Sequence, residues 1–236
     1  MAEIKQIHSR IDKAIFEYNM IEDGDRILIG VSGGKDSTLL VKYFSNRMKR
    51  KSVNFSYEAL YIHSDFASSF PLDVKNLYSK WNVPLNTIDC DVLNRLKKNE
   101  KMSCWWCSCQ RRTELLNYAI KNGFNKIALG HHMDDILETF IMNMMNKGNL
   151  STMIPLFKYN KYPITVIRPL CYIPETMIID YMNEKGYSKY TCTCSYQDNS
   201  GRKESRRLLA LLTENNQQKK EIMFKSLQNV QSEYLP

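Results

Sequence analysis

Residues 27–37 read Ile-Leu-Ile-Gly-Val-Ser-Gly-Gly-Lys-Asp-Ser (ILIGVSGGKDS), an apolar run that ends in two glycines and a lysine. The apolar half predicts a buried strand, and the leucines that follow predict a helix over about 35–48. Gly33 and Gly34 form the turn between them, where bare backbone N–H groups, the helix N-terminus and Lys35 can all face an anion. The stretch therefore predicts a phosphate-binding loop at the carboxyl end of a strand.

Predicted strands and helices alternate along the rest of the chain, which favours an α/β fold with a doubly wound parallel sheet and helices on both faces. We expect a helix over residues 1–24 packed on the core, a nucleotide-binding domain over 25–190, and a helical tail over 191–236. Strands are expected at 26–31, 55–63, 85–90, 126–130 and 164–168; helices are expected at 3–19, 35–48, 71–81, 108–122, 134–146 and 175–185, with two more in the tail.

Composition and charge restrict the function classes. The 236 residues are 43% hydrophobic, and no apolar run approaches the roughly 20 residues of a membrane span. The first residues carry charges throughout, so we expect a cytoplasmic protein without a membrane partner. A net charge of +8 favours a polyanionic partner, although solubility alone would also explain it. The clustered basic residues that we expect to bind RNA are Arg111, Arg112, Arg202, Lys203, Arg206 and Arg207.

The glycine loop has neither the Walker spacing nor the Rossmann fingerprint. The segment S-G-G-K-D-S after an apolar strand instead resembles the PP-loop of the ATP pyrophosphatases, which cleave ATP between the α and β phosphates. The resemblance implies that the loop binds ATP, with Lys35 and Asp36 as the catalytic residues and with Asp36 also placing Mg²⁺. The phosphate-holding residues that it implies are Ser32, Gly33, Gly34, Lys35 and Ser37.

A second motif, Gly-His-His-Met-Asp-Asp at residues 130–135, follows another predicted strand and opens a helix at the same edge of the sheet. Its two carboxylates suit a helix N-terminus as caps. In PP-loop thiolation enzymes a similar motif helps to form the nucleotide site, which implies ATP-binding roles for four of its residues. Three residues at the end of the second strand, Tyr61, Ile62 and His63, are expected beside the adenine. The implied set is Gly130, His131, Asp134, Asp135, Tyr61, Ile62 and His63.

Seven cysteines are present, and five of them lie in two short clusters. Cys104 and Cys107 form a C-x-x-C pair that we place just ahead of a helix, whereas Cys90 and Cys171 have apolar neighbours typical of the core. Close clusters in a chain without a secretory signal favour a metal site or a catalytic thiol over disulfides. The pair by itself is compatible with zinc, with a redox dithiol and with an iron–sulfur cluster.

The order of the motifs resembles the TtcA-like tRNA 2-thiocytidine synthetase family over nearly the whole chain. The loop, the C-x-x-C with its basic helix, the A-L-G-H-H-M-D-D segment, the I-R-P-L stretch and Cys194-Ser-Tyr-Gln follow one another as in that family. The resemblance implies that Cys104, Cys107 and Cys194 ligate a [4Fe–4S] cluster whose fourth iron has no protein ligand. Cys109 and Cys192 are alternative ligands should the register differ.

The resemblance implies an ATP-dependent tRNA thiolase that adenylates the C2 oxygen of a pyrimidine and replaces it with sulfur. The expected cofactors are ATP, Mg²⁺ and the [4Fe–4S] cluster. The expected partners are tRNA and a sulfur donor such as a cysteine desulfurase or free sulfide, with a homodimer as a further expectation. Two alternatives remain open: a related enzyme that acts on another tRNA base or on a small sulfur compound, desulfuration included, and an RNA-binding protein with a structural zinc.

Overall fold

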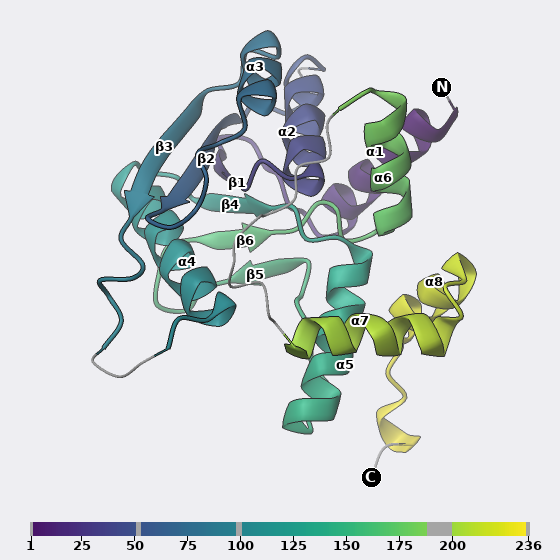
Figure 1. Ribbon diagram of the computed structural model, residues 1–236. Coiled ribbons are helices and arrows are strands. Elements are labelled where there is room, and N and C mark those ends of the chain that lie inside the picture. Colours follow the sequence, from purple (N-terminus) through teal and green to yellow (C-terminus); the bar gives the residue numbers. More distant parts are fainter. Residues whose placement is uncertain (1, 51–52, 98–100, 188–199, 235–236) are drawn as a thin grey trace.

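The computed structural model describes residues 2–50, 53–97, 101–187 and 200–234. These residues form a six-stranded sheet with helices on both faces (Figure 1). The strand order β3-β2-β1-β4-β6-β5 puts β1 in the middle, with the chain winding outward on either side. The strands are β1 (Arg26–Val31), β2 (Ser56–Ser64), β3 (Leu85–Cys90), β4 (Lys126–Leu129), β5 (Leu156–Lys158) and β6 (Thr165–Ile167).

The pairing of the strands confirms the doubly wound parallel sheet. β1 pairs in parallel with both β2 and β4, β2 with β3, and β4 with β6. The edge strand β5 was not predicted; it pairs with β6 in antiparallel orientation. At three residues it is too short to show the alternation by which strands are recognised in a sequence.

Helices connect the strands and lie close to their predicted positions, with one difference of consequence. The predicted helix at 108–122 begins four residues earlier, so Cys104 and Cys107 lie inside its first turn rather than ahead of it. The Ser103 side chain accepts a hydrogen bond from Trp106 N at 3.2 Å and caps this helix. The helices are α1 (Ala2–Glu17), α2 (Lys35–Met48), α3 (Leu72–Lys80), α4 (Cys104–Lys121), α5 (Met133–Lys147), α6 (Glu175–Glu184), α7 (Ser200–Thr213) and α8 (Gln217–Ser226).

Alternating side chains of the strands divide the core into two layers. On β1, Ile27 and Ile29 pack beneath α2, α3 and the helices around them, whereas Leu28 faces the opposite layer with α4. In the view of Figure 1, α2 and α3 lie above the sheet and α4 lies below it. Both faces of the central strand are therefore buried, as its uninterrupted apolar run requires.

The two ends of the described chain pack on the same layer. α1 buries Ile7, Ile11 and Ile15, and the C-terminal helices bury Leu209 of α7 and Phe224 of α8. α7 and α8 both contact α5, which brings the basic start of α7 toward the carboxyl edge of the sheet. None of the helices in the described ranges is long and apolar enough to cross a membrane.

Candidate active site

A cavity of about 610 Å³ opens at the carboxyl ends of β1, β2 and β4, where the direction of winding reverses. Four segments that are distant in the sequence meet around it: the glycine loop, the 130–135 motif, the start of α4 and the start of α7. The ionisable side chains that line it are Asp36, Cys104, Cys107, Arg111, Arg112, His131, Asp135, Glu138, Arg202, Lys203 and Arg206.

The glycine loop is held in shape by its own polar groups. Gly33 has φ +80°, and a Cβ there would lie 2.8 Å from Pro71 Cδ, so this position requires glycine. Ser37 Oγ donates to Gly34 O at 3.1 Å, and Ser32 Oγ accepts from Gly34 N at 3.3 Å. Gly34 is the N-cap of α2 and brings no capping side chain, which suits a bound phosphate at this helix terminus.

The second motif lies directly against the glycine loop. A Cβ on Gly130 would lie 3.1 Å from both Asp36 C and Ser37 N, which are backbone atoms. Only glycine allows the two chain segments to approach this closely without displacement. Gly130 therefore fixes the spacing between the loop and the start of α5.

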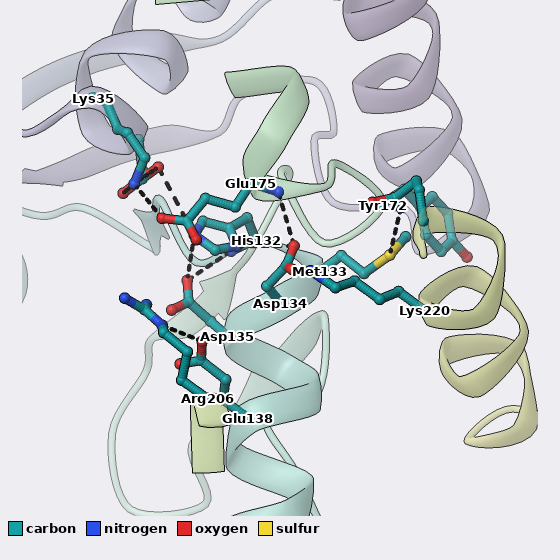
Figure 2. A network of polar contacts seen from close by, with 12 residues as sticks. Lys35, His132, Met133, Asp134, Asp135, Glu138, Tyr172, Glu175, Arg206 and Lys220 are labelled. Atoms are coloured by element: carbon teal, nitrogen blue, oxygen red, sulfur yellow. Dashed lines mark hydrogen bonds and ion pairs between the residues drawn. The ribbon is translucent and has the colours of Figure 1, made fainter. Parts of the chain in front are cut away.

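Lys35 lies between two carboxylates, those of Asp36 and Glu175, of which Figure 2 labels Glu175. Its Nζ is 2.8 Å from Glu175 Oε1 and 3.1 Å from Asp36 Oδ1. Burial alone would lower the pKa of Lys35, but Asp36 and Glu175 raise it above its ordinary value. The ammonium group stays charged and is available to a phosphate.

Asp36 is the carboxylate best placed for a metal beside phosphates. Burial raises its pKa, against the attraction of His132 and Lys35, and the nearby Asp135 adds to the rise. A cation between Asp36 and the phosphates would remove the cost of this buried charge. Among the described residues, no group of three or more His, Cys, Asp or Glu side chains is arranged to hold a metal ion.

The two aspartates of the second motif have different positions. Asp135 lines the cavity and accepts a hydrogen bond from His132 N at 3.0 Å, as in a capping box. Asp134 is buried away from the cavity: it accepts from Glu175 N at 2.8 Å and pairs with Lys220 Nζ at 2.7 Å (Figure 2). Burial alone would raise the pKa of Asp134, but these two partners lower it. Asp134 thus joins α5 to α6 and α8.

His131 lines the cavity, and its protonation state follows from its neighbours. Arg168 Nε donates to His131 Nδ1 at 3.3 Å, so the ring proton lies on Nε2. Burial lowers the pKa of His131 to about 4, with Arg168 acting in the same direction. The ring is neutral at physiological pH and offers one N–H donor.

The C-x-x-C pair shares the cavity with the glycine loop. Cys104 and Cys107 lie one helical turn apart on α4, and both line the cavity; Cys109 on the same helix does not. Cys107 Sγ is 3.7 Å from Ser64 Oγ. Cys194 and Cys192 lie outside the described residues. The buried positions predicted for Cys90 and Cys171 are confirmed, with exposed fractions of 1% and 0%.

Five of the six predicted RNA-binding residues line the cavity: Arg111 and Arg112 from α4, and Arg202, Lys203 and Arg206 from α7. Among the residues that the structure describes, the buried Arg111 Nε finds no hydrogen-bond partner. Arg207 lies elsewhere, exposed and paired with Glu204 at 2.7 Å.

The end of β2 brings one of the three expected residues, Ile62, to the cavity. Leu60, Ile62 and Ser64 line the cavity. Tyr61 and His63 alternate with them and face the other layer, where Tyr61 Oη donates to Ser68 O at 3.0 Å and His63 Nε2 lies 3.1 Å from Ala67 O.

Two acidic residues of the site were missed by the sequence analysis. Glu175 pairs with Lys35, and Glu138, which is mostly buried, accepts from Arg206 Nε at 2.8 Å (Figure 2). Glu138 lies three residues after Asp135 and therefore on the same face of α5, a spacing that marks it as a candidate. Glu175 opens a helix, where an acidic residue is expected for the helix dipole alone.

Comparison with known proteins agrees with this geometry. The family model described as "PP-loop domain" matches residues 4–219. The tRNA-cytidine(32) 2-sulfurtransferase 1 of Francisella tularensis subsp. tularensis (strain WY96-3418) is 34% identical over 96% of this chain and 86% of its own length. The tRNA-cytidine(32) 2-sulfurtransferase of Geotalea uraniireducens (strain Rf4) is 33% identical over 98% of this chain and 93% of its own length.

A solved structure shares the fold. The U34-tRNA thiolase NcsA from Methanococcus maripaludis, described with its [4Fe–4S] cluster, aligns with a TM-score of 0.78 over 99% of this chain and 80% of its own, at 19% identity. The loop, the shared cavity and the relatives lead to one conclusion: the chain belongs to the PP-loop family and, within it, to the tRNA-cytidine 2-sulfurtransferase enzymes.

Proposed function

We propose that this protein is an ATP-dependent tRNA thiolase that replaces the C2 oxygen of a cytidine with sulfur. The observation that carries the proposal is that the phosphate loop and the C-x-x-C pair line one cavity. Because the relatives are named for cytidine 32 of tRNA, we propose the same nucleotide as the target. We also propose that the enzyme acts in the cytoplasm, where its tRNA substrate would be.

ATP would bind with its phosphates on the glycine loop. Backbone N–H groups of Gly33 and Gly34, the hydroxyls of Ser32 and Ser37, and the charged Lys35 would hold them. Mg²⁺ would join Asp36 to phosphate oxygens and neutralise charge on the leaving pyrophosphate. Next to the loop, the apolar wall of Leu60, Ile62 and Phe66 would receive the adenine, and Ile62 is one of the three residues expected there.

Two displacements complete the reaction. The C2 oxygen of the cytidine attacks the α-phosphorus of ATP, and pyrophosphate leaves; sulfide then attacks C2, and the oxygen departs on AMP. Lys35 and the loop N–H groups would stabilise the charge that develops on the phosphates, because they are already in position before the reaction. His131 would donate its Nε2 proton in a hydrogen bond to an oxygen at the reacting centre.

Cys104 and Cys107, with Cys194 as the proposed third ligand, fit an iron–sulfur centre. The two described thiols lie on one helix face beside Arg111, so an anionic cluster would have cations around it. When bound, a [4Fe–4S] cluster with three cysteine ligands would supply an iron at which sulfide can be held. We propose a cysteine desulfurase or free sulfide as the sulfur source.

The basic side chains of α4 and α7 would hold the tRNA backbone at the mouth of the cavity. Arg111 and Arg112 come from α4, and Arg202, Lys203 and Arg206 come from α7, so the RNA backbone would meet cations from two helices. Trp105 is 71% exposed on the first turn of α4 and can stack on a neighbouring base, whereas Trp106 is anchored by donating Nε1 to Val92 O.

The direct test is a reconstitution. Protein purified without oxygen and loaded with iron and sulfide is mixed with ATP, Mg²⁺, sulfide and unmodified tRNA, and the nucleosides are analysed for 2-thiocytidine. We expect 2-thiocytidine together with AMP and pyrophosphate. A colourless protein with bound zinc and no thionucleoside would refute the proposal and favour an RNA-binding protein with a structural metal.

The cysteine assignment has matched variants. Cys107→Ser and Cys194→Ser are expected to lose the visible absorbance and the thiolation, because two thiolates do not retain a solvent-facing cluster. Cys109→Ser, on the same helix but outside the cavity, is expected to keep both. A brown, active Cys194→Ser protein beside a bleached Cys192→Ser protein would move the third ligand to Cys192.

A further inference from the structure

A second cavity, of about 360 Å³, adjoins the active-site cavity. It lies between α4 and the segment that leads through β5 into β6. Arg112, Leu115, Leu129 and His131 line both cavities, so the two spaces share a wall. In the arrangement proposed above, ATP, the metal ion and the cluster do not occupy this second cavity.

The floor of the second cavity is apolar and its rim is aromatic. Leu116, Ile127 and Val166 form part of the floor. On the rim, the rings of Phe157 and Tyr159 lie 4.8 Å apart at 78°, and Phe157 is 38% exposed. A flat ring that enters here would find a stacking surface that is open at one edge.

Two cations face this apolar space. Arg168 is held by donating Nη1 to Ile154 O at 2.5 Å and Nε to His131 Nδ1 at 3.3 Å. Burial lowers the pKa of Arg168, and the charge of Arg112 on α4 lowers it further. Within the described part of the chain, no carboxylate forms an ion pair with either guanidinium. Two uncompensated cations beside aromatic rings favour a ligand that combines a flat ring with hydrogen-bond acceptors or a phosphate.

We propose that the second cavity receives the unstacked target cytidine of the tRNA, with its base on Phe157 and Tyr159 and its acceptors toward Arg168 and Arg112. The proposal rests on the proposed function. The volume of the second cavity is in the range of small-ligand sites, and a pyrimidine nucleoside is a small ligand. The shared wall then puts the C2 oxygen of the base next to His131, at the boundary with the cavity that holds the phosphate loop and the cysteine pair.

The adenine of ATP is the competing occupant, and the lining argues against it. No residue of the glycine loop lines the second cavity, whereas the loop and the apolar side chains Leu60 and Ile62 line the first one together. ATP can therefore place its base and its phosphates in the first cavity alone. The second cavity is left to the other reactant.

The test compares base recognition in matched variants. Binding of two tRNAs to the cluster-loaded protein is measured, one with cytidine and one with an abasic residue at the target position, and their Kd ratio reports recognition of the base. In Phe157→Ala the ratio is expected to fall by about tenfold, the usual effect of one lost base–aromatic stack. Phe157→Leu keeps the apolar bulk and is expected to lower the ratio too. Phe16→Ala removes an exposed ring of α1 that does not line the cavity, and this variant is expected to keep the ratio.

Affinity for a non-hydrolysable ATP analogue is measured in parallel and is expected to stay unchanged in all three variants. A ratio unchanged in both Phe157 variants would overturn the assignment, and a weakened ATP analogue with an unchanged ratio would give the cavity to adenine. A wild-type protein that forms no thionucleoside would refute the proposed function itself. A thiolating wild type beside unaffected Phe157 variants would refute this inference alone.

Discussion

At the scale of single residues, the site is organised around Lys35. Asp36 and Glu175 both contact its ammonium group, yet their surroundings act on them in opposite directions. Burial dominates at Asp36 and raises its pKa. Burial would also raise the pKa of Glu175, but the hydrogen bond and the charge of Lys35 lower it. One carboxylate therefore costs stability when ionised and the other contributes to it.

This difference predicts opposite effects of two neutralising substitutions. The pKa of Asp36 is raised in the folded state. Its ionisation therefore lowers the free energy of unfolding as the pH rises above 3.8, the ordinary pKa of an aspartate. The pKa of Glu175 is lowered in the folded state. Its carboxylate therefore stabilises the fold above pH 4.5, the ordinary pKa of a glutamate, and this stabilisation is lost as the pH falls below that value. At pH 7 without nucleotide, Asp36→Asn is expected to raise Tm and Glu175→Gln to lower it, by about 2 to 4 °C for each kcal/mol.

Thermal unfolding of the two variants at pH 7 and pH 4 checks this expectation. The Glu175→Gln difference is expected to shrink at pH 4, where the wild-type carboxylate begins to take up its proton. Asp180 is exposed on α6, and Asp180→Asn serves as the control, with Tm expected to stay unchanged. Tm changes of the same sign in Asp36→Asn and Glu175→Gln would contradict the account.

The charge of Lys35 has its own prediction. Lys35→Met is expected to lower the release of AMP and pyrophosphate by at least about 100-fold, because the variant loses the cation that holds the phosphates in the transition state. Lys80→Met, at the exposed end of α3, is expected to keep wild-type turnover. Turnover is measured as pyrophosphate release. Normal release by a folded Lys35→Met protein would refute the loop assignment.

At the scale of elements, the starts of three helices converge on one edge of the sheet. Each is capped differently: Gly34 leaves the terminus of α2 to a ligand, Ser103 caps α4, and His132 with Asp135 closes the start of α5. The positive ends of these helices add to the attraction of the site for phosphate. The close approach at Gly130 determines the distance between the start of α2 and the start of α5.

Gly130→Ala tests that approach. Its Cβ would press on backbone atoms of Asp36 and Ser37 at 3.1 Å, so the variant is expected to weaken ATP binding by about tenfold or more while it keeps its fold. Gly148→Ala is the matched control: nothing lies within 4 Å of its Cβ, but its φ of +63° is strained for alanine. The control is expected to lose about 1 kcal/mol of stability and to bind ATP normally.

Calorimetric titration with a non-hydrolysable ATP analogue, together with denaturant unfolding, separates the two effects. Equal ATP affinity in Gly130→Ala and wild type would contradict the proposed contact between the two segments.

The elements also show what the sequence can predict. The glycine loop was predicted because glycines, a lysine and an apolar strand each signal their own role. The start of α4 was not, because Cys-Trp-Trp-Cys has no helical periodicity. On β2 the run Ala-Leu-Tyr-Ile lies between two buried layers, so no alternation marks which side chains face the cavity. Of the three residues expected beside the adenine, Ile62 lines the cavity together with Leu60, whereas Tyr61 and His63 alternate with them and face the other layer.

At the scale of the whole molecule, the C-terminal helices complete the site. α7 brings Arg202, Lys203 and Arg206 to a cavity whose other residues come from the first 140 positions. α8 is tied to the start of α5 by the pair between Lys220 and Asp134. The division of the chain at residues 24 and 190 stays a prediction, but the tail and the core share one hydrophobic cluster.

The arrangement of α7 predicts which arginines bind tRNA. Arg202→Gln is expected to reduce the slope of log Kd against log salt concentration by about 0.7 to 0.9, the effect of one lost phosphate contact. Arg207→Gln, one turn further along but paired with Glu204 outside the cavity, is expected to leave the slope unchanged. Binding of tRNA is titrated at several salt concentrations for each variant. An equal change in both would show that general charge, rather than the cavity, attracts the tRNA.

The central claim is that one cavity joins adenylation of a cytidine to its thiolation. It is tested most directly with tRNA whose target cytidine carries oxygen-18 at C2, turned over by the cluster-loaded protein with ATP and sulfide. The account predicts that AMP acquires the heavy oxygen in an amount equal to the 2-thiocytidine formed, because the C2 oxygen leaves on the α-phosphate. Unlabelled AMP released alongside 2-thiocytidine would contradict it.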